Sequence, residues 1–211
     1  MYYNIHTHTF SNNSEIVELV NQYPNEINTE LPNFTAGIHP WYLNENTFLD
    51  DLTAIENTIQ HPNFKAVGEC GLDKRIETSI EIQKKILIPQ LLLAEKYKKP
   101  VILHCVAAYQ EIIEIKKELK LTIPMVIHGF SKNSQVAESL IKNGFYLSFG
   151  KYLLQNPELE NVLKTIPLTQ LFLETDMIDQ TIFEVYSKAE RVLNRNLEPI
   201  INENYNRVFN Q

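Results

Sequence analysis

The sequence predicts an α/β fold with a parallel sheet, namely a TIM-type (β/α)8 barrel trimmed near its second strand. The chain has 211 residues. Short apolar segments alternate with segments whose apolar residues recur at helical spacing, which is the pattern of parallel α/β proteins. The chain contains eight such apolar segments, and eight parallel strands close a barrel of this type. Because a complete barrel usually needs about 250 residues, we expect part of it to be missing.

The expected strands combine β-branched and aromatic residues, which favour extended backbone. They span 2–6, 15–22, 34–39, 64–69, 101–105, 124–128, 145–149 and 170–175. The apolar spacing of 15–22 suits a helix or a strand, but its two valines and the following Pro24 favour a strand. The chain between the first and third strands has room for this strand but hardly for two helices, so we expect the trimming there.

The expected helices have apolar residues three or four positions apart. They span 47–60, 79–97, 108–119, 133–143, 182–195 and 197–209. Pro89 lies inside the second of these segments, and a proline removes a backbone donor and crowds the preceding turn. We therefore expect a kink or a helix restart near Ile88. The sequence contains no repeat and no linker, so residues 1–211 are expected to form a single domain.

Composition narrows the functional classes. The formal charge of −7 gives no basic footprint of the kind that dedicated DNA-binding modules show. Cys70 and Cys105 are too few for a disulfide framework and are expected to be reduced thiols. There is no secretory signal and no apolar run of the ~20 residues that a membrane span needs. We expect a cytoplasmic protein, monomeric and with no obligate protein partner.

Two histidines near the N-terminus suggest a metal site. In the stretch NIHTHTF, His6 and His8 are one residue apart. Successive side chains of a strand point to opposite faces, so these two imidazoles share a face at a strand end. Together they make half of a metal site.

The other half lies at the ends of later strands. An apolar segment runs directly into each of Glu69, His104 and His128, and Asp176 follows the last one. The carboxyl ends of parallel barrel strands open on one face, where active sites lie. Any one of these residues alone suits a structural role, but their shared position favours a joint site. Four imidazoles and two carboxylates suit two ions bridged by a carboxylate.

Six motifs in order resemble those of TatD-like metal-dependent hydrolases, the TatD-type deoxyribonuclease family with an amidohydrolase-type barrel. They are NIHTHTF, GIHPW, VGECGLD, QLLLAEKYKKPVILHC, IHGFS and LFLETD. The resemblance implies a TIM-type barrel, a divalent metal centre and hydrolysis of phosphodiester bonds, typically in DNA. It places His6, His8 and Asp176 on one ion and His104 and His128 on the other, with Glu69 linking the two.

The expected chemistry uses two divalent ions, Mg²⁺, Mn²⁺ or Zn²⁺, to activate a water for attack on phosphorus. We assign Asp176, Glu69 and His39 to the catalytic set. Asp176 serves either as general base or as ligand alone. His39, in GIHPW, either donates to a phosphate or leaving-group oxygen or is a structural histidine braced by its neighbours. Asp73 is expected to orient a ligand or a loop.

The substrate is less well defined by the sequence. TatD-like proteins often carry a His-x-Arg-Asp-like run after the fourth motif, where this chain has Val106 and Ala107. An arginine there would clamp a phosphate, and Lys132, Lys74 or Arg75 is a possible substitute. The leading hypothesis is a deoxyribonuclease acting on DNA ends, or on a small phosphodiester. The alternatives are an amidohydrolase-type enzyme for a small ester, amide or phosphoester, and a metal-binding protein without catalysis.

Overall fold

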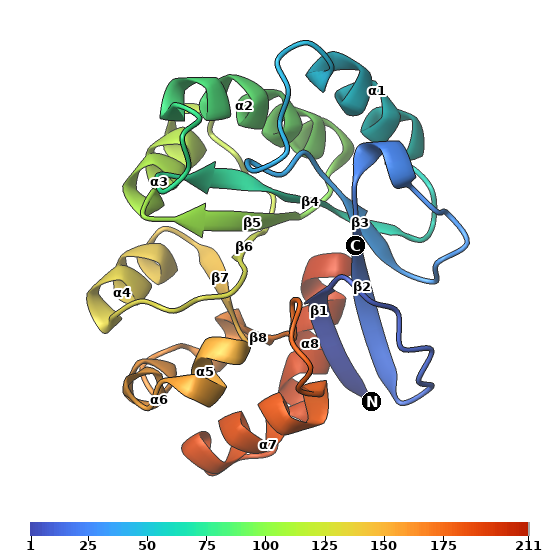
Figure 1. The fold of residues 1–211 in the computed structure, drawn as a ribbon. Helices are drawn as coiled ribbons and strands as arrows, with labels where there is room; N and C mark the ends of the chain where they lie inside the picture. The colour runs from blue at the N-terminus through green and yellow to red at the C-terminus, as the bar shows by residue number, and fades with distance from the viewer. Residues whose placement is uncertain (211) are drawn as a thin grey trace. The chain divides into compact units, whose positions relative to one another are not determined.

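The computed structural model describes residues 1–210 and contains the eight expected strands (Figure 1). They are β1 (Tyr2–Thr7), β2 (Ile16–Gln22), β3 (Phe34–Ala36), β4 (Phe64–Asp73), β5 (Val101–Val106), β6 (Met125–Ile127), β7 (Phe145–Phe149) and β8 (Leu171–Leu173). Their order in the sheet is the order of the sequence, β1 to β8. The pairs β1–β2, β3–β4, β4–β5 and β7–β8 are all parallel.

The helices include all six that the sequence predicts. These are α1 (Phe48–Thr58), α2 (Ile80–Tyr97), α3 (Tyr109–Glu118), α4 (Ser134–Lys142), α7 (Ile182–Leu193) and α8 (Glu198–Phe209). Four short helices were not expected: the 3-10 turns η1 (Pro24–Glu26) and η2 (Leu168–Gln170), and the helices α5 (Lys151–Gln155) and α6 (Glu158–Leu163). Within residues 1–210, no α-helix lies between β1 and β2 or between β2 and β3. The trimming predicted near the second strand is confirmed.

The chain forms two compact units, which are described separately. The terminal unit comprises Met1–Val20 and the chain from Val126 onward, and the central unit comprises Asn21–Met125. Whether they act as the single expected domain stays a prediction. In the part of the chain that the structure describes, no helix combines the length and the apolar character that crossing a membrane requires.

In the terminal unit, the first strand is held by the C-terminal helices. Figure 1 shows β1 beside α8, and both α7 and α8 contact this strand. The Tyr3 hydroxyl donates to Asn202 Oδ1 at 2.6 Å, and the backbone N–H of Tyr3 donates to the Tyr186 hydroxyl. Asn4 exchanges two hydrogen bonds with Thr175, one through each end of its amide. These contacts tie β1 to the segment that follows β8.

In the central unit, α2 packs on β4 and runs without interruption past Pro89. Of the two outcomes expected near Ile88, the helix restart is therefore wrong, and the kink stays a prediction. An internal proline costs about 3 kcal/mol or more, but this helix buries an extensive apolar face: Ile86, Leu87, Leu91, Leu93 and Ala94. Buried Gln90 also fixes it, since its side chain accepts from the Ile38 N–H at 2.7 Å and donates to the Ile86 carbonyl at 3.2 Å.

Two strand ends differ from the prediction. Strand β4 continues four residues beyond Glu69 because its last residues pair with β5, as in Leu72 opposite Cys105. Strand β3 stops at Ala36, three residues before His39. After it, Gly37 lies so close to β4 that a Cβ would be 2.7 Å from the Glu69 carbonyl oxygen. Glu69 thus lies inside a strand, and His39 lies in the loop after one.

Candidate metal-binding clusters

A first cluster of potential ligands, the terminal cluster, consists of His6, His8 and Asp176. Their donor atoms lie within 4.8 Å of one another. The Nε2 atoms of His6 and His8 are 3.7 and 3.6 Å from Asp176 Oδ1. His6 is fully buried, whereas the His8 and Asp176 side chains are 18% and 17% exposed. The cluster therefore has one closed side and one side open to a substrate.

The backbone brings these three residues together. The Asp176 N–H donates to the His6 carbonyl at 2.9 Å, and Thr7 forms a parallel bridge with Asp176. Asp176 has φ 58°, in the left-handed region. Aspartate occupies that region more readily than most residues, and such conformations are common at functional sites. The bridge and the turn hold its carboxylate against both imidazoles.

His128 lies in the same unit, directly after β6. Its ring centroid is 4.3 Å from that of His6. His128 Nδ1 is 3.3 Å from Glu174 Oε1, which also accepts the Gly129 N–H at 2.7 Å. Glu174 is fully buried, and its second oxygen, Oε2, has no hydrogen-bond partner among the described residues. Since the carboxylate faces Nδ1, it directs the Nε2 atom of His128 away from itself, as partners of metal-binding histidines do.

A second cluster, the central cluster, consists of His39, Glu69 and His104. All three are buried, and their donor atoms also lie within 4.8 Å of one another. Glu69 Oε1 is 3.0 Å from His39 Nε2 and 2.9 Å from His104 Nδ1. The Glu69 N–H donates to Asn21 Oδ1 at 2.6 Å, which fixes the strand at this point.

Asp73 orients His104 from the far side of the imidazole. Its Oδ2 is 3.2 Å from His104 Nε2 and accepts the Trp41 indole N–H at 2.8 Å. Burial alone would raise the pKa of the Asp73 carboxyl. Hydrogen bonds from Trp41, from the Arg75 N–H and from His104 outweigh it and hold that pKa below its ordinary value. Asp73 is therefore an anion near neutral pH and accepts the proton of His104 Nε2.

The proton positions distinguish the two histidines. His39 Nδ1 accepts the backbone N–H of Trp41 at 3.1 Å, so a neutral His39 carries its proton on Nε2 and donates it to Glu69. This arrangement suits a proton donor better than a metal ligand. The His104 ring lies between two carboxylates, with Nδ1 2.9 Å from Glu69 Oε1 and Nε2 3.2 Å from Asp73 Oδ2. Imidazole nitrogen and carboxylate oxygen are both ligands for divalent ions, so Glu69 and His104 fit a metal site.

The structure brings the sequence-predicted residues into groups within each unit: His6, His8 and Asp176 in one, Glu69, His104 and His39 in the other. Assignment of His104 and His128 to one ion, with Glu69 linking two ions, stays a prediction. Lys74, a proposed phosphate contact, forms an ion pair with Glu111.

Sequence reasoning missed two residues of the terminal unit. Glu174 lies in the motif LFLETD, and its signal was an acid at the end of a fully apolar strand. Lys151 begins α5, a helix that was not expected, and its Nζ is 3.4 Å from Asp176 Oδ2. This lysine places a positive charge beside the terminal cluster.

The two cysteines are not part of either metal-binding cluster. Cys70 and Cys105 are buried and unbonded to each other, and burial raises the pKa of the Cys105 thiol to about 12. Neither is poised to react as a thiolate.

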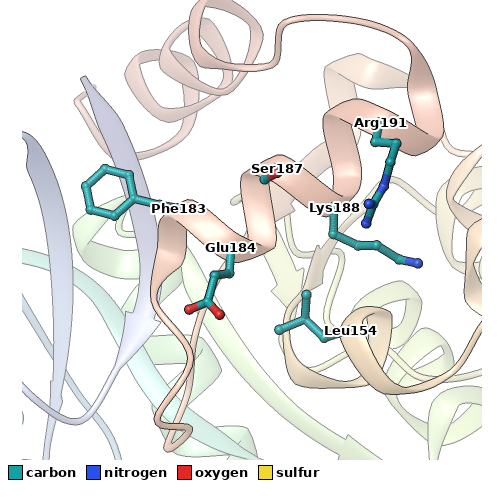
Figure 2. A pocket seen from close by; sticks show the side chains of 6 residues that line it. All are labelled: Leu154, Phe183, Glu184, Ser187, Lys188 and Arg191. Carbon is teal, nitrogen blue, oxygen red and sulfur yellow. The ribbon is translucent and has the colours of Figure 1, made fainter.

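A hollow of about 450 Å³ lies along α7, lined by Leu154, Phe183, Glu184, Ser187, Lys188 and Arg191 (Figure 2). It includes none of the predicted site residues.

Comparison with known proteins points to one family across the chain. The family model described as TatD related DNase matches residues 2–210. The 3'-5' ssDNA/RNA exonuclease TatD of Erwinia tasmaniensis is 31% identical over 147 residues, which are 67% of this chain and 56% of that protein. The metal-dependent hydrolase YabD of Bacillus subtilis is 34% identical over 131 residues, 60% of this chain and 51% of that protein. The chain thus spans about half the length of the curated relatives it matches.

A solved structure agrees on the fold. The crystal structure of YjjV, a TatD homolog from Escherichia coli K12, superposes with a TM-score of 0.83 at 21% identity and covers 100% of this chain and 98% of that one. With the parallel strand order, this likeness shows that the chain has the predicted TIM-type (β/α)8 fold.

Proposed function

The chain belongs to the TatD-related DNase family, and from that premise we propose that it is a metal-dependent hydrolase that cleaves phosphodiester bonds at the ends of DNA. The observation that carries the proposal is the pair of side-chain clusters, each with two imidazoles and one carboxylate whose donor atoms lie within 4.8 Å, with His39 of the central cluster as a proton donor. Nitrogen and oxygen donors in such numbers suit Zn²⁺ or Mn²⁺ and, through the carboxylates, Mg²⁺.

We propose two divalent ions. His6, His8 and Asp176 would hold one, and Glu69 with His104 would hold part of the other. We also propose that His128 is a further ligand and that Glu69 links the two ions, as the sequence analysis predicts. When bound, such ions lower the pKa of a water and neutralise charge on phosphate oxygens.

The chain's own residues supply the proton transfers. Asp176 turns its second oxygen, Oδ2, toward Lys151 rather than toward the histidines, so this oxygen can accept a proton from the attacking water. His39 holds its proton on Nε2, as the Trp41 contact requires, and can deliver it to the leaving oxygen. In the absence of substrate, Glu69 Oε1 accepts this Nε2–H bond and thereby holds the His39 ring in its orientation.

Lys151 is the proposed phosphate contact. Its side chain is 30% exposed, so the ammonium can turn from Asp176 to a substrate oxygen. Hydrogen bonds to charged groups contribute about 1.5–3 kcal/mol. In this proposal Lys151 supplies the positive charge that is absent at Val106, where TatD-like proteins often carry an arginine.

The alternative function is hydrolysis of a small ester, amide or phosphoester. The formal charge of −7 favours it, because long nucleic acids are attracted to basic surfaces. The cytoplasmic location and the monomeric state also stay predictions.

A substrate panel with matched variants tests the proposal. We expect the metal-loaded protein to shorten labelled single-stranded DNA, and Asp176→Asn to abolish this cleavage. Lys151→Gln should lower kcat/KM for phosphodiesters roughly 10-fold or more and leave neutral aryl esters unaffected. Lys142→Gln is the control, since that lysine is 71% exposed on α4. Hydrolysis of neutral esters alone, with no phosphodiester cleaved under Mg²⁺, Mn²⁺ or Zn²⁺, would reject the nuclease.

A further inference from the structure

A cleft of about 550 Å³ opens beside the central cluster, and we name it the His39 cleft. Its wall includes His39, Tyr23, Tyr42, Glu26 and Asp51. The volume lies within the range of small-molecule binding sites. All of these residues belong to the central unit.

Aromatic rings line and flank this cleft. Tyr23 and Tyr42 meet edge to face with centroids 5.3 Å apart, and Tyr42 also lies 5.5 Å from the His39 ring. Tyr42 and the adjacent Trp41 are 62% and 57% exposed, unusually high for rings of this size. The bond to Asp73 holds the Trp41 indole in place despite that exposure. Rigid, exposed rings of this kind are surfaces on which planar heteroaromatic groups stack.

The charge of the cleft excludes a phosphate as its occupant. Of the described residues that line it, two are carboxylates, Glu26 and Asp51, and none is lysine or arginine. Carboxylates repel phosphate, but they accept hydrogen bonds from the amino groups of nucleobases. The occupant is therefore planar, carries no negative charge and donates hydrogen bonds.

We propose that the His39 cleft, with the exposed rings of Trp41 and Tyr42, binds the nucleobase next to the phosphate that is cleaved. This inference rests on the proposed function and specifies its substrate: a nucleotide is recognised by its base, and a simple alkyl phosphodiester is not. The placement follows from His39, because the same side chain lines the cleft and presents the Nε2 proton.

Trp41 reports binding directly, since it is the only tryptophan in the sequence. The metal-loaded protein is titrated with adenosine, which carries no phosphate, and with ribose 5-phosphate, which carries no base. We expect adenosine to quench the tryptophan fluorescence saturably and ribose 5-phosphate to leave it unchanged. Equal or stronger quenching by ribose 5-phosphate would overturn the proposal.

Kinetics test the same site through Tyr42. The substrates are 2'-deoxyadenosine 5'-(p-nitrophenyl phosphate) and methyl p-nitrophenyl phosphate, which share a leaving group, and only the first carries a base. Tyr42→Leu should lower kcat/KM for the nucleoside ester by roughly 5- to 150-fold, the effect of losing one stacked base, and leave the methyl ester unchanged. Tyr42→Phe keeps the ring and should keep most of the activity.

The outcomes separate the two proposals. If both esters are cleaved but Tyr42→Leu affects them equally, or not at all, the base site is wrong and the phosphodiesterase stands. If neither ester is cleaved while adenosine still quenches Trp41, the cleft binds a nucleobase and the proposed hydrolysis is wrong.

Discussion

At the scale of single residues, Glu174 shows how a buried carboxylate can serve a site without touching substrate. It is fully buried, accepts the Gly129 N–H and faces His128 Nδ1. A buried carboxyl group with one unbonded oxygen costs stability, and such groups persist where function requires them. A side chain at position 150 would collide with Glu174, because a Cβ there would lie 2.9 Å from the Glu174 carbonyl oxygen. Gly150 thus allows this strand end to pack closely.

Glu174→Gln should separate stability from metal binding. The amide oxygen can still accept the Gly129 N–H, so the free energy of unfolding of the metal-free protein should change by less than about 1 kcal/mol. The charge that orients His128 is lost, and Zn²⁺ or Mn²⁺ affinity should fall roughly 10- to 100-fold. Calorimetric titration with each metal, beside chemical denaturation, measures both. Unchanged affinity would show that Glu174 has only a structural role.

Sequence reasoning anticipated some site residues better than others. Grouping His6 with His8 needed only the alternation of side chains on a strand, and Asp176 followed from its place after the last strand. The pattern could not show that β4 continues past Glu69, because that extension depends on pairing with β5. It also missed Lys151, whose helix is only five residues long and has no amphipathic period to detect.

At the scale of elements, Glu95 on α2 fixes the approach to β6. Its carboxylate accepts the Thr122 and Ile123 N–H groups at 2.8 and 3.3 Å and the Thr122 hydroxyl at 2.7 Å. Partial burial would raise the pKa of this carboxyl. The Lys98 ammonium and the bonds from Thr122 and Ile123 outweigh burial and lower the pKa from 4.5 to about 2.

A lowered pKa makes this contribution pH dependent. The stabilisation is complete above the ordinary pKa of 4.5 and is lost as the pH falls toward 2. Glu95→Gln should therefore lower the free energy of unfolding at pH 7 by about 1–3 kcal/mol, and the gap from the unmodified protein should close between pH 4.5 and 2. Urea denaturation across this range measures the gap. Glu138→Gln is the control, because Glu138 forms an exposed ion pair on α4. This substitution should leave the free energy of unfolding almost unchanged at every pH.

The elements were largely predictable because most are long and strongly patterned. All eight strands and the six longer helices follow from apolar spacing and β-branched content. The short helices α5 and α6 span five and six residues, too few for a periodic signal. Helix α2 also continues through Pro89, where a restart was one expected outcome, because burial of its apolar face outweighs the backbone hydrogen bond that the proline removes.

At the scale of the whole molecule, the ligand clusters couple metal binding to stability. Each cluster gathers residues that are distant in the sequence, as His6 and Asp176 are, or Glu69 and His104. A cation bound to such groups favours the folded chain, because the unfolded chain cannot hold them together.

Chelation should therefore destabilise the protein. At a free metal concentration 1,000 times the Kd, binding contributes about 4 kcal/mol, so EDTA should lower the Tm by roughly 10 °C. Scanning calorimetry before and after dialysis, and again after returning Zn²⁺ or Mn²⁺, measures the change. Asp176→Asn is the matched variant and should respond less to EDTA. Identical Tm values with and without chelator would contradict metal binding by these clusters.

The division of the chain into units also has a temporal consequence. The central unit is one continuous stretch, Asn21–Met125, whereas the terminal unit joins Met1–Val20 to the chain from Val126 onward. A ribosome releases His6 and His8 long before it reaches Asp176. The middle of the nascent polypeptide can acquire its native contacts while its leading histidines still have no carboxylate partner. The terminal cluster therefore cannot assemble before Asp176 has been synthesised, which delays its loading with a cation until that point.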